Sequence, residues 1–215
     1  MKKAIIMSIS FILVLLASLF ILNAMETKEY IRDNSDTANE GSCCSSEMES
    51  DELSDYSLFQ IDCEWESESG KTVTLKSFEG KQTVMAMIFA NCTYACPIIV
   101  NDMKNIERSL TDKERNNINF LLISIDPERD TPEALTQFAE RFELNLDRWT
   151  LITSNKNNVD ELSAALGFKY KKENDGSFSH SNIINIIDSN GEVLKQNFGL
   201  NQDISSITNE LKKHI

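Results

Sequence analysis

Two largely apolar runs in the middle of the chain, the first of them continuous, constrain the fold most. The first is TVMAMIF, Thr83–Phe89, and the second is INFLLISID, Ile118–Asp126. Runs of this length without polar alternation are typical of strands buried on both faces, as in a sheet with helices on either side. A helical pattern follows the first run, with apolar residues at spacings of 4, 3 and 4 on one face and a proline in the first turn. These residues are Pro97, Ile99, Met103, Ile106 and Leu110.

The rest of the chain continues this alternation. Thr131 and Pro132 predict the start of a second helix, as N-cap and first helical residue. The apolar face of this helix, directed to the core of the protein, is formed by Leu135, Phe138 and Phe142. Two short strand-like runs, SLFQIDCEW and KTVTLKSF, come earlier, around the turn ESESG. The later segments predict a strand in WTLIT and a helix in NNVDELSAALGF. A hairpin follows in SNIINIIDSNGEVLKQNFG, and a last helix in QDISSITNELKKHI. This order predicts an α/β protein of thioredoxin-like fold, with a central mixed sheet and helices on both faces.

The N-terminus predicts a membrane anchor. After Lys2 and Lys3, the segment Ala4–Ala24 has 21 residues and no charge, which is long enough to span a bilayer. We favour an uncleaved signal-anchor at residues 1–24 over a cleaved signal peptide, because the run is long and Leu22-Asn23-Ala24 is a poor cleavage site. The two lysines place the N-terminus inside and the body outside. We therefore expect a single-pass protein of the cell membrane, with its domain on the extracytoplasmic side, where disulfides persist.

An acidic segment separates the anchor from the predicted domain, which covers residues 58–215. Residues 25–57 carry ten acidic and two basic residues and few large apolar ones, which predicts a flexible tether. The tether contains Cys43 and Cys44, whose soft sulfurs would suit a soft metal; alternatively, they are solvated and form a disulfide between chains. The net charge of the whole chain, −13, argues against a nucleic-acid partner, since phosphate binding needs a basic surface.

Two cysteines directly follow the first buried strand, in FANCTYACPI. Cys92 and Cys96 lie in a loop that runs into a helix, and the partial positive charge at a helix N-terminus favours the thiolate. Thiolates both attack disulfides and bind metals, so the spacing alone leaves a redox pair, a disulfide and a metal site open. The redox motif usual in this fold has two intervening residues and a preceding tryptophan. Here three residues intervene and Asn91 precedes, which favours a metal site over a fast dithiol oxidoreductase.

A histidine further along is predicted to join the cysteines. His180 enters the strand of the C-terminal hairpin, and in a thioredoxin-like layout the loop before that strand lies beside the cysteine loop. Two thiolates and one imidazole form a soft, three-coordinate site suited to Cu(I), whereas zinc normally takes a fourth ligand. The alternative is a structural histidine. Strand alternation predicts that Cys63 is a buried free thiol on the face of Phe59 and Ile61, and His214 is predicted to be solvated.

The motifs CTYACP, SIDPERDTPEALTQFAERF and SHSNIINIIDSNGEV, in this order, resemble the Sco/SenC family of copper-binding, thioredoxin-fold proteins. The resemblance implies a membrane-tethered assembly factor for cytochrome c oxidase that delivers copper to the CuA site of subunit II, or reduces the cysteines of that site, or both. It implies Cys92, Cys96 and His180 as copper ligands and places Asp126 close to the site as a supporting residue. The chain departs from the family in lacking the proline that is frequent after the first cysteine, and in its acidic tether with two cysteines.

Four functions remain open at this point. A copper chaperone would hold Cu(I), or also Cu(II), and pass it to subunit II or a similar acceptor after loading from an unidentified donor. A thiol–disulfide reductase would attack a partner disulfide with one thiolate and resolve the mixed disulfide with the other. A peroxide-reducing or redox-sensing protein would have one reactive cysteine, and a binding module would have only a structural disulfide. We favour the chaperone, with the reductase as the main alternative.

Overall fold

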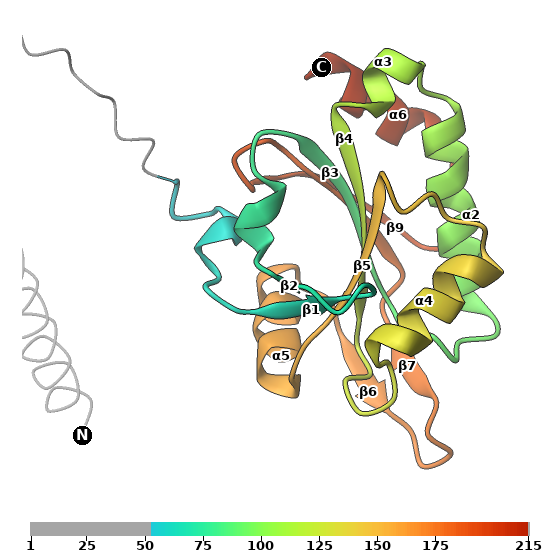
Figure 1. Ribbon diagram of the computed structural model, residues 1–215. Helices are drawn as coiled ribbons and strands as arrows, with labels where there is room; N and C mark the ends of the chain where they lie inside the picture. The colour runs from blue at the N-terminus through green and yellow to red at the C-terminus, as the bar shows by residue number, and fades with distance from the viewer. Residues whose placement is uncertain (1–52, 215) are drawn as a thin grey trace, which may run out of the picture. The chain divides into compact units, whose positions relative to one another are not determined.

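The computed structural model describes residues 53–214, and a seven-stranded mixed sheet forms the centre of this domain (Figure 1). The strand order is β2-β1-β5-β4-β3-β8-β9. The three central strands β3, β4 and β5 are parallel, and β8, β9 and β1 pair antiparallel at the two sides. The strands are β1 (Trp65–Ser67), β2 (Thr72–Val73), β3 (Gln82–Ile88), β4 (Ile118–Ser124), β5 (Trp149–Thr153), β8 (Ile183–Ile187) and β9 (Val193–Phe198).

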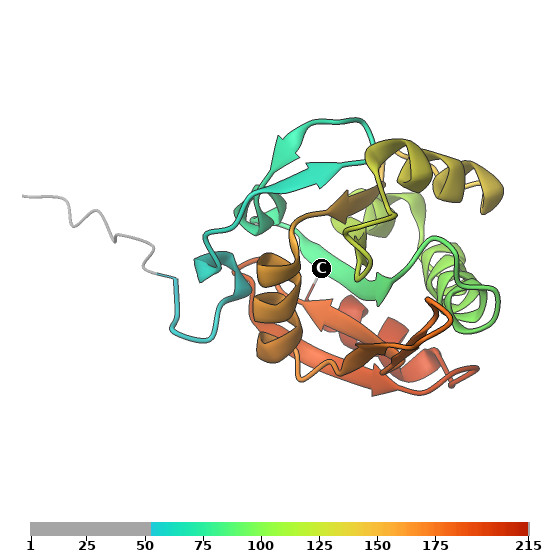
Figure 2. The same ribbon diagram turned by 90° about the horizontal axis from the view of Figure 1, so that it is seen from below.

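Helices cover both faces of the sheet, as the two apolar runs predict. Figure 2 shows α5 on one face, and α2 and α4 on the other. All seven residues of β3 are buried, which confirms that a continuous apolar run here means a strand covered on both sides. The helices are α2 (Ala95–Arg108), α3 (Asp112–Arg115), α4 (Pro132–Arg141), α5 (Lys156–Ala165) and α6 (Ser205–Lys213), with short 3-10 helices at Leu58–Gln60 and Leu75–Phe78.

The predicted helix signals are found where expected. The Thr131 side chain accepts a hydrogen bond from the backbone N–H of Ala134, and Pro132 opens α4. Gly167 follows α5 with a φ of +63°, the left-handed conformation that commonly ends a helix. The β8–β9 hairpin turns at Asn190-Gly191, and Gly191 has a φ of +90°.

The prediction for SLFQIDCEW was wrong. Leu58–Gln60 form a 3-10 helix in which the Ser57 side chain accepts from the N–H of Phe59, and β1 begins only at Trp65. Leu58 and Phe59 are neighbours in sequence and both are buried, so the side chains here do not alternate as they would in a strand. Cys63 is consequently not a buried thiol: it is partly exposed, with its Sγ 3.4 Å from Glu161 Oε2.

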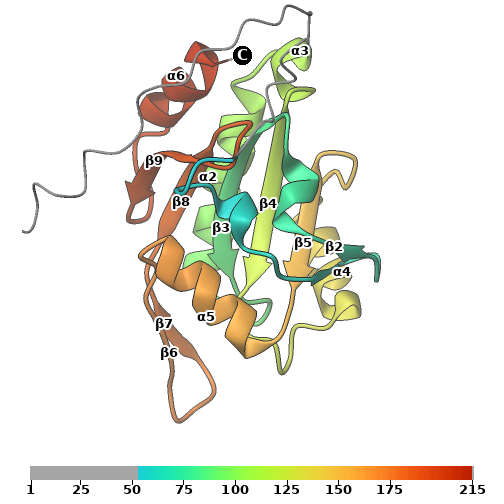
Figure 3. The same ribbon diagram turned by 90° about the vertical axis from the view of Figure 1, so that its left-hand side faces the viewer.

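A second, small sheet was missed. Strands β6 (Tyr170–Lys172) and β7 (Phe178–His180) form an antiparallel hairpin with a turn at Asp175-Gly176, where Gly176 has a φ of +80°. Figure 3 shows this hairpin at the end of the central sheet toward which the arrowheads of β3 and β4 point. His180 therefore ends β7 and does not enter β8.

The predicted anchor, residues 1–24, and most of the predicted tether, including Cys43 and Cys44, lie outside the described residues. Across residues 53–214, none of the helices combines the length and the hydropathy that crossing a bilayer requires. Residues 53–57, at the end of the predicted tether, contact the domain. Leu53 packs against the core, and the Ser54 hydroxyl donates to Glu192.

Candidate metal centre

The cysteine loop lies between the end of β3 and the start of α2. The N–H of Cys92 donates to the carbonyl of Phe89 at 3.1 Å, which folds the loop into a tight turn. Cys96 is the second residue of α2, and its backbone N–H donates to Cys92 Sγ at 3.2 Å. The amide of the first helical turn, which has no partner within the helix, thus stabilises negative charge on the first sulfur. Both sulfurs are buried, and Cys96 is fully so.

His180 is presented by the β6–β7 hairpin. Its Nδ1 lies 2.7 Å from the carbonyl oxygen of Ser181, so Nδ1 carries the proton and donates, and Nε2 is left with a free lone pair. The imidazole packs between two aromatic rings. Phe89 approaches edge-on at a centroid distance of 5.8 Å, and Phe168 stacks at 6.0 Å with an interplanar angle of 21°. These contacts fix both the tautomer and the ring orientation.

The structure brings Cys92, Cys96 and His180 together, as the sequence predicts. One donor atom from each residue lies within 4.8 Å of the other two. Metal–sulfur and metal–nitrogen bonds are about 2.0–2.3 Å long, so donors around one ion lie at most about 4.6 Å apart. The three residues fit a soft metal ion after small side-chain movements. In the part of the chain that the structure describes, no second group of this kind is found.

The two sulfurs differ in their affinity for protons. A hydrogen bond from the Cys96 thiol, and a second one from His180 when its imidazole is protonated on both nitrogens, lower the pKa of Cys92 to about 3, against the opposing effect of burial. The hydrogen bond to Cys92 and burial raise the pKa of Cys96. Burial lowers the pKa of His180, but its hydrogen bonds to Cys92 and to the Ser181 carbonyl outweigh burial and raise it. At neutral pH the pair therefore holds one thiolate, on Cys92, and one proton, on Cys96.

The site opens into a cavity of about 370 Å³. One wall comes from the cysteine loop and the start of α2, and the other from the β6–β7 hairpin and Arg129. Tyr94, between the two cysteines, is 74% exposed. Cys92 and His180 line this cavity, whereas Cys96 does not, so a partner protein can approach the site at Cys92 from the side of the loop.

Asp130 was missed as a part of this site. Its Oδ2 accepts from the N–H of Ala90 at 2.9 Å and from the hydroxyl of Ser124 at 2.6 Å. Arg141 donates to the carbonyl of the same Ala90 at 2.7 Å. The N–H and the carbonyl of Ala90, two residues before Cys92, are thus both hydrogen-bonded to side chains. The available signal was the second aspartate of the DPERD sequence, directly before the predicted helix start at Thr131.

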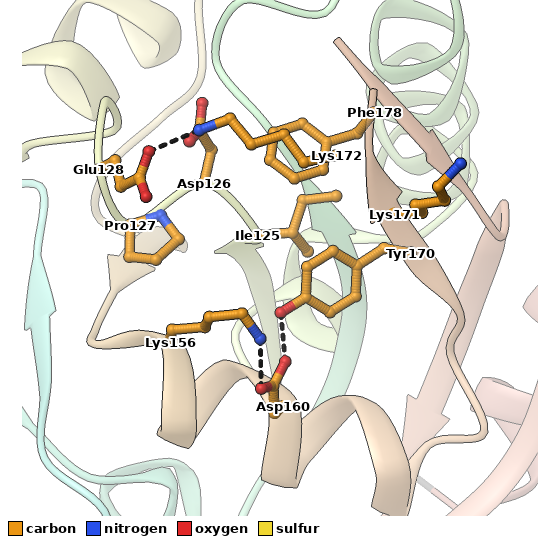
Figure 4. A pocket seen from close by; sticks show the side chains of 10 residues that line it. All are labelled: Ile125, Asp126, Pro127, Glu128, Lys156, Asp160, Tyr170, Lys171, Lys172 and Phe178. Atoms are coloured by element: carbon orange, nitrogen blue, oxygen red, sulfur yellow. Dashed lines mark hydrogen bonds and ion pairs between the residues drawn. The ribbon is translucent and has the colours of Figure 1, made fainter. Parts of the chain in front are cut away.

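Asp126 is not among the candidate ligands, and it is linked to their cavity only through Arg129. It is 1% exposed, and its Oδ2 accepts from Arg129 Nε. Arg129 lines the cavity of Cys92 and His180, whereas Asp126 lines a neighbouring cavity of about 460 Å³ that contains no cysteine or histidine (Figure 4). A supporting role of Asp126 toward the ligands stays a prediction.

Comparison with known proteins identifies the family. Residues 54–215 match the SCO1/SenC family. The SCO1 protein homolog of Bacillus subtilis (strain 168) is 28% identical over 152 residues, which cover 69% of this chain and 78% of the relative.

Solved structures show the same fold. A SCO1/SenC family lipoprotein from Bacillus anthracis str. Ames matches with a TM-score of 0.65 at 26% identity, over 71% of this chain and 92% of that chain. BsSco, described as a member of the Sco family of cytochrome c oxidase assembly proteins with a disulfide switch, matches with a TM-score of 0.61 at 26% identity, over 71% and 90%. Bradyrhizobium japonicum ScoI, solved with copper bound, matches in fold with a TM-score of 0.61 at 23% identity, over 71% and 96%. The matched region includes the whole candidate metal centre, and this chain belongs to the SCO1/SenC family.

Proposed function

We propose that this protein is a membrane-tethered, extracytoplasmic copper chaperone that carries Cu(I) on Cys92, Cys96 and His180. The observation that carries the proposal is the convergence of two sulfurs and one imidazole nitrogen, each within 4.8 Å of the others. Copper is the cargo here and not a resident cofactor. Soft thiolates select monovalent copper, and the free Nε2 of His180 completes a three-coordinate set.

The acceptor we propose is the CuA site of cytochrome c oxidase subunit II, or a similar site with cysteine ligands. Support comes from relatives described as copper-bound and as cytochrome c oxidase assembly proteins. Three-coordinate copper leaves one direction free for an incoming thiolate, and the open side of the cavity supplies that direction. Each new bond to the acceptor can then replace one bond to the carrier. Residues 1–24 would anchor the domain to the membrane, on the extracytoplasmic side.

Anaerobic titration with Cu(I) tests the proposal. The full chain in detergent is reduced, and Cys43 and Cys44 are replaced by serine in every variant so that the tether cannot bind copper. We expect one Cu(I) per chain, and at least a tenfold loss of affinity in Cys92→Ala, Cys96→Ala and His180→Ala. Cys63→Ala is the matched control, because its thiol lies outside the site. Stoichiometric binding that none of the three site substitutions weakens would exclude this site.

A second candidate function is thiol–disulfide reduction, because the pKa of Cys92 is lowered to about 3. The Cys92 thiolate would attack a partner disulfide, and Cys96 would resolve the mixed disulfide after losing its proton. The partner gains two electrons and two thiols, and this protein is left with a Cys92–Cys96 disulfide. His180→Ala separates the two functions: copper affinity should fall, whereas reduction of a peptide disulfide corresponding to the acceptor's cysteines should largely persist.

A further inference from the structure

The candidate metal ligands lie on two separate segments of the chain, and a third segment, a loop, contacts both of them. The cysteines follow β3, and His180 ends β7. The loop 125–131, between β4 and α4, contacts both segments. On one side, Asp130 accepts from the N–H of Ala90, at the start of the cysteine loop. On the other side, Arg129 Nη2 donates to the carbonyl of Gly176, at the tip of the β6–β7 hairpin.

The guanidinium of Arg129 is held in place for its contact with the hairpin. Its Nε pairs with the buried carboxylate of Asp126, which fixes the base of the guanidinium. Its Cζ lies 5.9 Å from the centroid of the Phe178 ring, on the strand that ends with His180. A Cβ atom at Gly176 would lie only 3.2 Å from Arg129 Nη1. The hairpin thus approaches the guanidinium at a residue that has no side chain.

The hairpin depends on such contacts, because it cannot be stable alone. Its two strands have three residues each, and an isolated two-stranded hairpin is marginally stable at best. Behind it lies the 460 Å³ cavity of Figure 4, lined by Ile125, Tyr170 and Phe178 among others, so packing against the domain is incomplete there. On its other side Phe178 contacts Phe89 at a centroid distance of 5.2 Å, and contacts at the edges of the cavity add to this packing in holding the strand that carries His180.

Besides the contact of His180 with Cys92, three polar links cross from the hairpin to the rest of the described domain, and they differ in strength. Figure 4 shows Lys172 paired with Glu128, and Tyr170 Oη donating to Asp160. The Lys172–Glu128 pair is solvated, with side-chain exposures of 41% and 75%, and such pairs contribute little. Arg129 is itself 36% exposed, but of the three only Arg129 is anchored on a carboxylate that is 1% exposed, which limits the freedom of the guanidinium that donates to Gly176.

We propose that Arg129 is a positioning residue for His180: through the Gly176 carbonyl and the Phe178 ring it holds the β6–β7 hairpin where the imidazole meets the two sulfurs. The inference rests on the proposed copper-carrier function. It assigns different tasks to neighbouring residues of one loop. Asp130 holds the cysteine half of the site, and Arg129 holds the histidine half.

A double-mutant cycle tests whether Arg129 acts through His180. Cu(I) affinity is measured by competition with a chelator in the full chain, in the wild type, Arg129→Gln, His180→Ala and the double variant. We expect Arg129→Gln to lose roughly 10- to 100-fold in affinity, the range seen when residues that orient a ligand are removed. In the His180→Ala background, the same substitution should change affinity less than twofold. An equal loss in both backgrounds would show that Arg129 acts elsewhere and would overturn the proposal.

Backbone hydrogen exchange of the copper-free protein gives an independent readout. Arg129→Gln should accelerate exchange at residues 170–181 at least tenfold, while β3 and β4 keep their protection. Lys171→Gln is the matched control, since Lys171 lies in β6 and pairs only within the hairpin, with Glu173. If Arg129→Gln fails to fold with Asp126 left unpaired, Asp126→Asn/Arg129→Gln removes the buried charge and the link together. Unchanged hairpin exchange would refute positioning, whereas equal Cu(I) affinity of the wild type and His180→Ala would instead refute the proposed function.

Discussion

The carboxylate of Asp130 holds the backbone of Ala90, whose N–H donates to Asp130 Oδ2 at 2.9 Å. The same oxygen accepts from the hydroxyl of Ser124, at the end of β4. One buried oxygen thus joins the ends of two adjacent parallel strands, and the cysteine loop starts from this fixed point. The sulfurs of the candidate metal centre are thus held in position without a metal, which would lower the entropic cost of binding one.

Replacing Asp130 should therefore loosen the cysteine loop. In Asp130→Ala the N–H of Ala90 loses its acceptor in a buried position, and a buried unsatisfied donor costs about 1–3 kcal/mol. We expect the free energy of unfolding to fall by about that amount, measured by urea denaturation of the reduced protein. Asp130→Asn retains one carbonyl oxygen as an acceptor and should lose less. Equal stability of the wild type and Asp130→Ala would contradict the role assigned to this contact.

The low pKa of Cys92 predicts how its reactivity depends on pH. A thiol whose pKa lies above the pH gains about tenfold in thiolate per pH unit. Cys92, with a pKa of about 3, is already a thiolate at pH 5. Its rate of alkylation by iodoacetamide should thus change little between pH 5 and 8, as measured by peptide-resolved mass spectrometry.

Cys63 is the internal control for this experiment. It is partly exposed, and burial and the nearby Glu161 raise its pKa, so its alkylation rate should climb steeply over the same range. His180→Ala removes one of the hydrogen bonds that lower the pKa of Cys92 and should shift the onset of its reactivity to higher pH. Parallel rate profiles for Cys92 and Cys63 would show that Cys92 is not a stabilised thiolate.

The sheet and the cysteine loop were predictable because local patterns determine them. β3 is buried on both faces and β4 almost entirely so, and their apolar runs differ from the surface segments among residues 53–214. Thr131-Pro132 and Asn190-Gly191 mark a helix start and a turn by backbone chemistry alone. The position of Cys96 at a helix start follows from the helical spacing of the residues after it.

The parts of the site that depend on contacts between distant segments were not predictable. Arg129 and Gly176 are 47 residues apart, and nothing in either segment encodes their hydrogen bond. The β6–β7 hairpin was missed because its strands are too short and too polar for a clear alternation. Cys63 was wrongly predicted to be buried because a strand was assumed from Ser57 to Trp65. Leu58–Gln60 form a 3-10 helix instead, and β1 begins only at Trp65. In each case tertiary packing decided the local conformation.

Gly191 should be required for docking of the segment 53–60 onto the domain. Its φ is +90°, and a Cβ would lie 2.5 Å from Ser57 Oγ and 2.7 Å from the Phe59 ring. Gly191→Ala should cost about 1–2 kcal/mol for the left-handed backbone and a further 1–3 kcal/mol, roughly, for overpacking. Gly70→Ala is the matched control, because Gly70 has a φ of +73° with nothing within 4 Å of a Cβ, so only the backbone cost applies. Equal loss of stability in the two variants, by urea denaturation, would disprove the packing contribution.

Proton release should make the Cu(I) affinity depend on pH in a defined way. Because the pKa of Cys92 is lowered and that of Cys96 is raised, binding must expel the proton of Cys96 throughout the neutral range. Affinity should therefore rise about tenfold per pH unit, the linkage value for one proton. The pKa of His180 is also raised, so below that pKa a second proton must leave and the slope should approach two.

Competition with a Cu(I) chelator, corrected for protonation of the chelator itself, measures this slope between pH 5.5 and 8.5. His180→Ala should bind more weakly and keep a slope of one wherever Cys92 is still a thiolate, because the histidine proton no longer takes part. The steeper slope at low pH must then belong to His180 and not to a carboxylate such as Asp130. A wild-type slope near zero would mean that both sulfurs are already deprotonated, and a slope of two across the whole range would mean that Cys92 also holds a proton. Either result would overturn the division into one thiolate and one thiol on which the electrostatic account of the site depends.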